Sequence, residues 1–337
     1  MRPSFHPRLI NGPFDDPGLF VPFLFQKRAV IFDLGDMSSL PAKDILKISH
    51  AFVTHTHMDH FIGFDRLLRL FLGREVQLNV YGPKGFLKNA EGKLAGYTWN
   101  LVDNYNYHLS LLLTEIRSDN VITKKYHCQN KFLAPERAWE LPFDGVLHEE
   151  AAFSVCGVIL NHSIPCLAYS LHERFHVNIV KERLENLGLE TGPWLSQFKQ
   201  ALYSQTDPNS KFEVPRADRP QPKRFYLGDL AAQIARITSG QKITYITDVV
   251  YNDANIRKIV EFAKDSDHLF IEAAFLERDH EIAKERCHLT ARQAGELAAR
   301  AGAKRFSIFH FSPRYTYQKD FLYQEAEEAY NRAISSQ

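Results

Sequence analysis

The sequence predicts a mixed α/β (α+β) fold in which two sheets pack on each other and helices cover their outer faces. The chain has 337 residues, of which 45% are hydrophobic, so it can bury a large core. Its N-terminal third reads mainly as strands, whereas strands and helices alternate after residue 242. A run of strands followed by an alternating half is typical of two packed sheets with external helices.

One helix interrupts the strands of the N-terminal third. It is expected at Ile62–Phe71, where apolar residues recur at helical spacing. The segment from about Trp99 to Glu150 has no clear period and receives no assignment. The strands predicted before residue 161 are Phe20–Phe25, Ala29–Leu34, Ile48–Thr54, Val76–Tyr81 and Phe153–Leu160.

The C-terminal part alternates between strands and helices. Thr290 is a typical N-cap for the helix that ends before Gly302. The predicted strands are Lys242–Thr247, Leu269–Ala273 and Arg305–Phe309, and the predicted helices are Asn255–Lys264, Thr290–Arg300 and Asp320–Ile334.

A polar stretch at about 171–225 reads as an insertion on the surface of a single domain that spans residues 1–337. It opens with a helical piece at Val177–Leu187, which ends at Gly188. Proline and polar residues dominate the rest of the stretch, and such a composition suits a surface excursion better than a core.

Composition and charge limit the classes of function. Lys plus Arg number 41 and Asp plus Glu 40, a net charge of +1, so any RNA contact must rest on a local basic patch. Cys156 and Cys166 could be bridged across a turn, but Cys156 lies in a predicted buried strand, where free cysteine behaves as a small hydrophobe. No signal-peptide pattern or membrane-length apolar run is present. We therefore expect a cytoplasmic protein with reduced thiols and no membrane contact.

Four potential metal ligands follow the strand that ends at Phe52-Val53. His55 and His57 alternate as strand neighbours do, so their rings point the same way and can share one metal. Asp59 and His60 come after the chain has turned and can hold a second metal. Imidazoles combined with a carboxylate form a ligand set suited to zinc. The alternative is a polar loop whose histidines are solvated. Under that alternative, three histidines would occur within six residues by chance alone.

The segment His55-Thr56-His57-Met58-Asp59-His60, followed by Phe61-Ile62-Gly63, resembles the signature of the metallo-β-lactamase superfamily. This resemblance implies a four-layer αββα sandwich with two Zn²⁺ per chain, Mn²⁺ or Fe²⁺ being the alternatives. It implies that the first two histidines and a later one bind one ion, that Asp59, His60 and a further histidine bind the other, and that an aspartate bridges both. The positions still needed are supplied at predicted strand ends by His162, Asp248 and His310.

Three further segments resemble the ribonuclease Z branch of that superfamily: Asn161–Tyr169, Phe306–Tyr315, and Ile271–Phe275 together with Cys287–Thr290. The resemblance gives His288 a catalytic role at the leaving oxygen, as a general acid or as a group that stabilises the charged phosphate. Glu272 would orient its imidazole. Asp59 would join the proton relay besides binding metal. The alternatives are a solvated strand end for Glu272 and a helix-entry residue for His288.

Some segments depart from the tRNA-processing pattern of that branch. The N-terminal loop carries Asp15 and Asp16 where the branch has basic residues, and Met58 replaces a usual glycine. The segment Asp33–Ser38 differs from the branch's glycine-rich one, and the region after Tyr169 lacks the glycine-rich tip of a tRNA-gripping arm.

The sequence therefore predicts a di-zinc, metal-dependent hydrolase, namely a phosphodiesterase or endoribonuclease that resembles ribonuclease Z. Its partner would be RNA, with precursor tRNA as the named substrate, and the chain would form a homodimer. A hydrolase of a small phosphodiester or another ester is the alternative, because a fold does not fix a substrate. A non-enzymatic RNA-binding or dimerising protein is the third hypothesis, and the complete ligand set argues against it.

Overall fold

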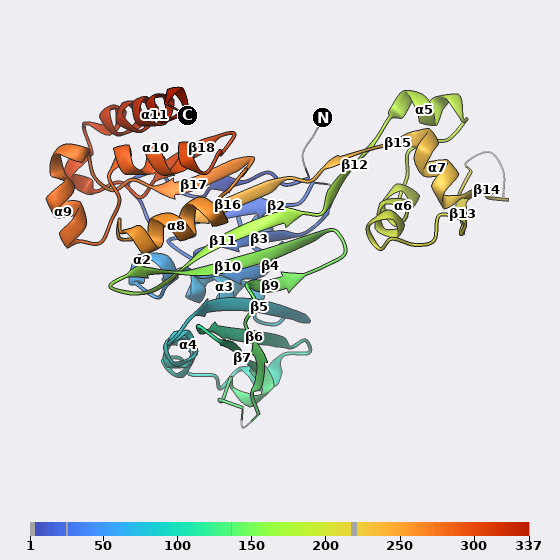
Figure 1. Cartoon of the computed structure of the whole chain (residues 1–337). Coiled ribbons are helices and arrows are strands. Elements are labelled where there is room, and N and C mark those ends of the chain that lie inside the picture. The colour runs from blue at the N-terminus through green and yellow to red at the C-terminus, as the bar shows by residue number, and fades with distance from the viewer. Residues whose placement is uncertain (1–3, 25, 136, 217–220, 337) are drawn as a thin grey trace. The chain divides into compact units, whose positions relative to one another are not determined.

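A computed structural model describes residues 4–24, 26–135, 137–216 and 221–336, which form two compact units (Figure 1). The larger unit comprises Phe5–Leu147, Cys156–Ser170 and Lys242–Gln337. The smaller unit contains the predicted insertion and extends to Gln241. That the whole chain is one domain with an insertion at 171–225 stays a prediction.

The first sheet has eight strands in sequence order, β1 to β8. Its central strands β3 to β6 are parallel, and the flanking strands are antiparallel. The strands are β1 (Arg8–Leu9), β2 (Leu19–Pro22), β3 (Ala29–Phe32), β4 (Ile48–Phe52), β5 (Val76–Pro83), β6 (Leu109–Ile116), β7 (Asn120–His127) and β8 (Trp139–Pro142).

The second sheet has six strands in the order β18-β17-β16-β11-β10-β9. Strands β16, β17 and β18 run parallel, so their carboxyl ends meet at one edge. The strands are β9 (Val146–Glu149), β10 (Phe153–His162), β11 (Ile164–Glu173), β16 (Lys242–Ile246), β17 (His268–Glu272) and β18 (Phe306–Phe309).

Aromatic rings of both sheets pack against each other inside the larger unit. Phe32 of β3 stacks on Tyr169 of β11 and on Tyr245 of β16, with ring centroids 5.7 and 5.9 Å apart. The Tyr169 hydroxyl donates to the Val53 carbonyl at 2.7 Å. Stacked rings of this kind join the two sheets face to face and exclude water from between them.

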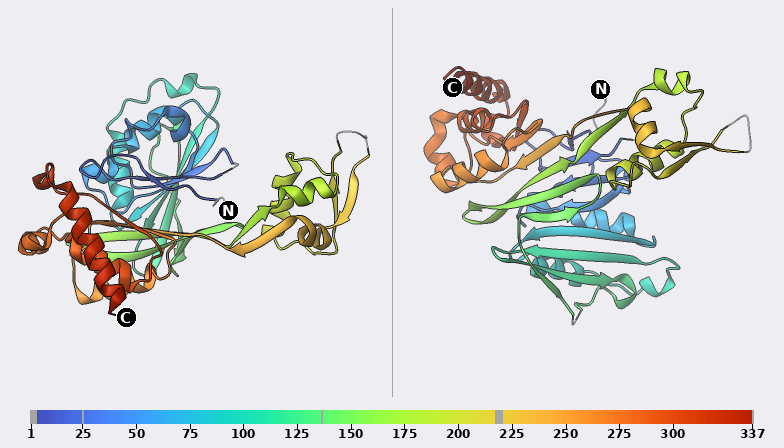
Figure 2. Two further views of the ribbon diagram at one scale, coloured as in Figure 1. Left: turned by 90° about the horizontal axis from the view of Figure 1, so that it is seen from above. Right: turned by 45° about the vertical axis from the view of Figure 1, so that its right-hand side comes forward.

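Helices cover the two outer faces of this sandwich, and the views of Figure 2 show them on opposite sides of the strands. Buried residues of α1, α3 and α4 pack on the first sheet, and those of α8, α10 and α11 pack on the second. The predicted fold class, two packed sheets with helices outside, is thereby confirmed. The α-helices of this unit are α1 (Ala42–Ile45), α2 (Met58–Phe61), α3 (Phe64–Phe71), α4 (Phe86–Ala95), α8 (Asp253–Phe262), α9 (His280–Glu285), α10 (Ala291–Arg300) and α11 (Lys319–Ser335). Its 3₁₀ helices are η1 (Val102–Asn104), η2 (Cys128–Asn130), η3 (Glu277–Asp279) and η4 (Pro313–Tyr315).

Most predicted elements of the larger unit are confirmed, with shifted ends. Thr290 caps α10 in a capping box with Gln293, as an N-cap should. The predicted strand Phe20–Phe25 is β2, which ends at Pro22, and Phe25 lies outside the described residues. Cys156 and Cys166 are not bridged by a disulfide.

The smaller unit has its own apolar cluster, centred on Trp194, Phe198 and Leu230. The expected helix Val177–Leu187 is confirmed over Lys181–Asn186 and was wrong at its start, because its first residues form a strand that pairs with a distant one. The elements are β12 (Phe175–Ile179), α5 (Lys181–Asn186), α6 (Trp194–Tyr203), β13 (Lys211–Val214), β14 (Lys223–Tyr226), α7 (Leu227–Ile234) and β15 (Ala235–Ser239). Strand β12 pairs with β15, and β13 with β14. Within the described residues, no helix combines the length and the apolar character needed to cross a membrane.

Candidate metal centre

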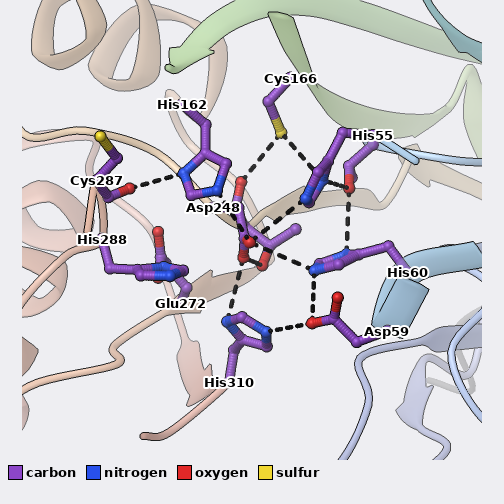
Figure 3. A network of polar contacts seen from close by, with 12 residues as sticks. His55, Asp59, His60, His162, Cys166, Asp248, Glu272, Cys287, His288 and His310 are labelled. Atoms are coloured by element: carbon purple, nitrogen blue, oxygen red, sulfur yellow. Dashed lines mark hydrogen bonds and ion pairs between the residues drawn. The ribbon is translucent and has the colours of Figure 1, made fainter. Parts of the chain in front are cut away.

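The seven predicted metal ligands come together at one edge of the larger unit, where strands of both sheets end, and Figure 3 labels all of them except His57. His55 and His57 follow β4, whereas Asp59 and His60 lie in α2. The other three stand at the ends of β10, β16 and β18: His162, Asp248 and His310.

Asp248 is the centre of this arrangement. Its Oδ2 atom lies 3.5 Å from His55 Nε2 and 3.4 Å from both His60 Nε2 and His162 Nε2. Its Oδ1 atom lies 3.1 Å from His310 Nδ1. One buried carboxylate therefore faces four imidazoles that come from three different parts of the chain.

The donor atoms fall into groups that a metal ion could join. Those of His55, His57, His162 and Asp248 all lie within 4.8 Å of one another, and so do those of Asp59, His60 and His310. His55 Nε2, His60 Nε2 and His310 Nδ1 are buried and have no hydrogen-bond partner. Leaving buried polar atoms unpaired is costly, so these nitrogens fit residues that ligate a cation.

Groups behind the ligands fix the orientation of their rings. Asp33 accepts from His60 Nδ1 at 2.9 Å, and its other contacts are the Thr54 amide and the Tyr245 hydroxyl. The Cys287 carbonyl contacts His162 Nδ1 at 2.8 Å. Imidazoles that bind metal commonly donate their second nitrogen to such acceptors. Sequence reasoning did not name Asp33 as a site residue, although its place directly after the buried strand β3 was a usable signal.

Burial and mutual charge shift the ionisation of the centre. Burial lowers the pKa of His55 to about 2. Burial also opposes charge on His60, but the Asp248 and Asp33 carboxylates raise the pKa of His60 well above its usual value. Burial raises the pKa of Asp59, and contacts with two histidines more than offset it, so the net shift is downward. Because its pKa is lowered, the Asp59 carboxylate stays negative and can attract a cation.

Glu272 and His288 form a pair beside the metal ligands. His288 Nδ1 lies 2.8 Å from Glu272 Oε2, and Glu272 Oε1 accepts from the Val249 amide at 2.7 Å. Burial lowers the pKa of His288, but the charge and hydrogen bond of fully buried Glu272 raise it to about 9. The pair therefore has the contact predicted for a positioned imidazole. The potential ligand atoms of both residues also lie within 4.8 Å of those of Asp248 and His310. A metal-ligand role for His288 is therefore the competing interpretation.

Several backbones at the centre are left-handed although none is glycine. Asp33, Asp248, Cys287 and His310 have φ values of 59°, 50°, 62° and 62°. Aspartate and histidine tolerate this region better than most residues. The turn at each position aims a side chain or a carbonyl at the centre directly from the end of a strand or a helix.

A cavity of about 250 Å³ opens beside the centre. Asp59, His288 and His310 form part of its wall. The remaining lining residues are Phe14, Asp15, Asp16, Ala274, Phe275, Arg286, Phe311, Ser312 and Pro313. A substrate bound in this cavity would contact His288 of the predicted catalytic pair together with the predicted ligands Asp59 and His310.

Comparisons with known proteins agree with this geometry. Residues 210–311 match the family described as Beta-lactamase superfamily domain. Ribonuclease Z of Deinococcus radiodurans is 29% identical over 280 residues, which cover 83% of this chain and 80% of that protein. Ribonuclease Z of Geobacillus kaustophilus is 28% identical over 272 residues, covering 80% of this chain and 72% of the relative.

A solved structure of similar fold is the metallo-β-lactamase fold protein YhfI from Bacillus subtilis, with a TM-score of 0.55, 14% identity, and coverage of 97% of this chain and 94% of that one. A likeness at such low identity carries the fold alone, whereas the ribonuclease Z similarity extends over most of the sequence. Together they show that part of the chain resembles the β-lactamase superfamily domain, that most of its sequence is similar to ribonuclease Z, and that its fold is similar to a metallo-β-lactamase fold.

Proposed function

We propose that the chain is a phosphodiesterase that uses two divalent cations, zinc in the first place, to cleave RNA. The observation that carries this proposal is the Asp248 carboxylate, 3.1–3.5 Å from ring nitrogens of four histidines. A carboxylate so placed can bridge two ions, one among His55, His57 and His162 and the other among the ligands Asp59, His60 and His310. Bound cations would supply Lewis-acid stabilisation of the phosphate and activation of water.

The protein's own groups account for orientation and proton transfer. His288, with its pKa raised to about 9 by Glu272 in spite of burial, carries a proton at neutral pH and can donate it to a leaving oxygen. Glu272 is held by the Val249 amide, so it keeps the imidazole in one orientation. Asp59 Oδ2 lies 3.3 Å from His310 Nε2 and lines the cavity, so it would exchange protons with water in the cavity.

RNA as the substrate class is supported by the relatives named Ribonuclease Z. We extend this to precursor tRNA cleaved at its 3′ end, to a homodimer and to a cytoplasmic location, all as parts of the proposal. The net charge of +1 argues that phosphate contacts come from local patches.

A second candidate is hydrolysis of a small phosphodiester without tRNA recognition. Asp15 and Asp16 favour it, because both carboxylates line the cavity beside the centre, where they repel additional phosphates. The two functions share one reaction and differ only in the substrate.

The test compares bis-p-nitrophenyl phosphate with precursor tRNA, each with and without chelator, and counts metal by elemental analysis. We expect two ions per chain and chelator-sensitive hydrolysis. Asp248→Ala should abolish hydrolysis and lower the metal content while the circular dichroism spectrum stays native. Asp103→Ala is the matched control, because Asp103 is an exposed aspartate with no ion pair in the described structure. One ion or fewer in replete protein, or near-normal activity of Asp248→Ala, contradicts the bridging assignment.

A further inference from the structure

The cavity beside the metal centre has an acidic wall. Asp15 and Asp16 come from the loop before β2 and stand in the same cavity as His288. Asp15 is exposed and Asp16 is half-buried. Both belong to a loop that sequence analysis singled out and that the proposed chemistry does not use.

Backbone contacts hold this wall in place. The Phe311 amide donates to the Pro13 carbonyl at 2.6 Å, which ties the loop to the segment after β18. Asp15 Oδ2 accepts from the Gly12 amide, and Asp16 Oδ2 accepts from the Asp36 amide, each at 3.1 Å. Within the described structure, the second oxygen of each carboxylate has no hydrogen-bond partner. Each of these two lining carboxylates thus keeps one acceptor oxygen that no donor among the described residues satisfies.

The other walls are aromatic and basic. Phe14 packs edge-on against Phe311 with ring centroids 5.4 Å apart, and Phe14 is partly exposed whereas Phe311 is buried. Arg286 is exposed and makes no ion pair among the described residues, so its guanidinium is available to a phosphate.

We propose that this cavity binds a single flat ring bearing N–H donors, such as a nucleobase with an exocyclic amine, on the side of the scissile phosphodiester that carries no further phosphate group. The inference rests on the proposed phosphodiesterase function and names its substrate class. The carboxylates accept the N–H donors, an exposed Phe14 face stacks on the ring, and Arg286 contacts the scissile phosphate.

Size and charge set the limits of this site. A volume of about 250 Å³ has room for one ring system and is below the usual range of about 300–1,000 Å³ for pockets that enclose a drug-sized ligand. A terminal phosphate in the cavity would lie close to two carboxylates, and like charges at short range repel. The acidic wall therefore admits the end of a chain or a dinucleotide and excludes a phosphorylated end.

The experiment uses the metal-loaded enzyme and the symmetrical dinucleotides dCpdC and dUpdU, with products separated by chromatography. Cytosine carries an amine where uracil carries a carbonyl, so the pair isolates one donor group. We expect a kcat/KM ratio of about tenfold in favour of dCpdC, which corresponds to about 1.4 kcal/mol. In Asp15→Asn and Asp16→Asn the ratio should fall toward one or invert, since an amide can donate to the uracil carbonyl. Asp103→Asn, which removes an exposed carboxylate outside the cavity, should keep the wild-type ratio.

Additional substrates separate the alternatives. Dinucleotides phosphorylated at both ends should be poor for the wild type and better for the Asn variants. Preference for 4-nitrophenyl phosphocholine over dCpdC would make the site a cation pocket and overturn the proposal. Ligand-observed NMR with cytidine and uridine tests the cavity without turnover. If no diester, bis-p-nitrophenyl phosphate included, is hydrolysed, the proposed function fails, while cytidine binding that depends on Asp15 still supports the cavity. Hydrolysis with no base preference and equal nucleoside binding refutes the cavity proposal alone.

Discussion

Removing the charge of Glu272 should change how the stability of the protein depends on pH. Glu272 is fully buried, and the side chain of its partner His288 is 18% exposed. Glu272→Gln keeps the shape and retains an oxygen that can accept from the Val249 amide. It removes the negative charge that holds the proton on His288.

The magnitude is set by the pKa of His288. Burial lowers this pKa, but Glu272 raises it from the ordinary value of 6.5 to about 9. A rise of this size corresponds to about 3 kcal/mol of stability. Because the folded pKa is the higher one, this stability is fully present below pH 6.5 and is lost as the pH rises toward 9.

The assay is urea unfolding of chelator-treated wild type and Glu272→Gln at pH 6 and pH 9.5. The stability advantage of the wild type should shrink by about 3 kcal/mol between the two pH values, whereas other titrating groups cancel in the difference. Glu281→Gln is the matched control, because its contact with His280 is solvent-exposed and should give no such change. An equal advantage at both pH values would refute the assigned coupling between Glu272 and His288.

Four other substitutions in the larger unit have expected outcomes. His288→Ala should lower kcat on the order of 10²–10⁴-fold with metal content unchanged, and elemental analysis that reveals lost metal would make His288 a ligand. Gly295→Ala should destabilise the protein by about 1–3 kcal/mol in urea unfolding, since a Cβ would meet the Ala326 carbonyl of α11 at 2.1 Å. Gly92→Ala in α4 meets nothing within 4 Å and should be neutral or stabilising by up to about 1 kcal/mol; equal effects of the two changes would contradict the close packing. Asp33→Asn should weaken metal affinity by about 10–100-fold in a chelator competition, as loss of an orienting carboxylate does, and unchanged affinity would argue against that role.

The sequence could single out the candidate ligands that the structure brings together, because they follow strands whose apolar pattern is local. His55, His57, Asp59 and His60 stand together in one segment, and the edge of a sheet gathers residues from strand ends. The orienting contacts were not predictable in the same way, since the Asp33–Tyr245 bond joins residues 212 positions apart.

Strand β12 illustrates the same limit for secondary structure. The stretch Val177–Leu187 has apolar residues at spacings compatible with a helix. Its first residues belong to β12, which pairs with β15 so that Val177 lies opposite Ile237. A short segment with an ambiguous period takes its conformation from such a partner, and the local pattern contains no information about it.

The left-handed backbones at the metal centre imply a trade between durability and activity. Each such residue costs roughly 1–2 kcal/mol relative to a glycine, which adopts the same turn without strain. Asp248 and His310 hold this conformation with φ values of 50° and 62°. Replacing either residue by glycine would relieve the backbone strain but remove a predicted metal ligand. A variant selected only for thermal stability could therefore gain stability and lose hydrolytic activity. Only selection for activity would remove such glycine variants. Glycine at these two positions after laboratory evolution would therefore show that stability was selected without activity.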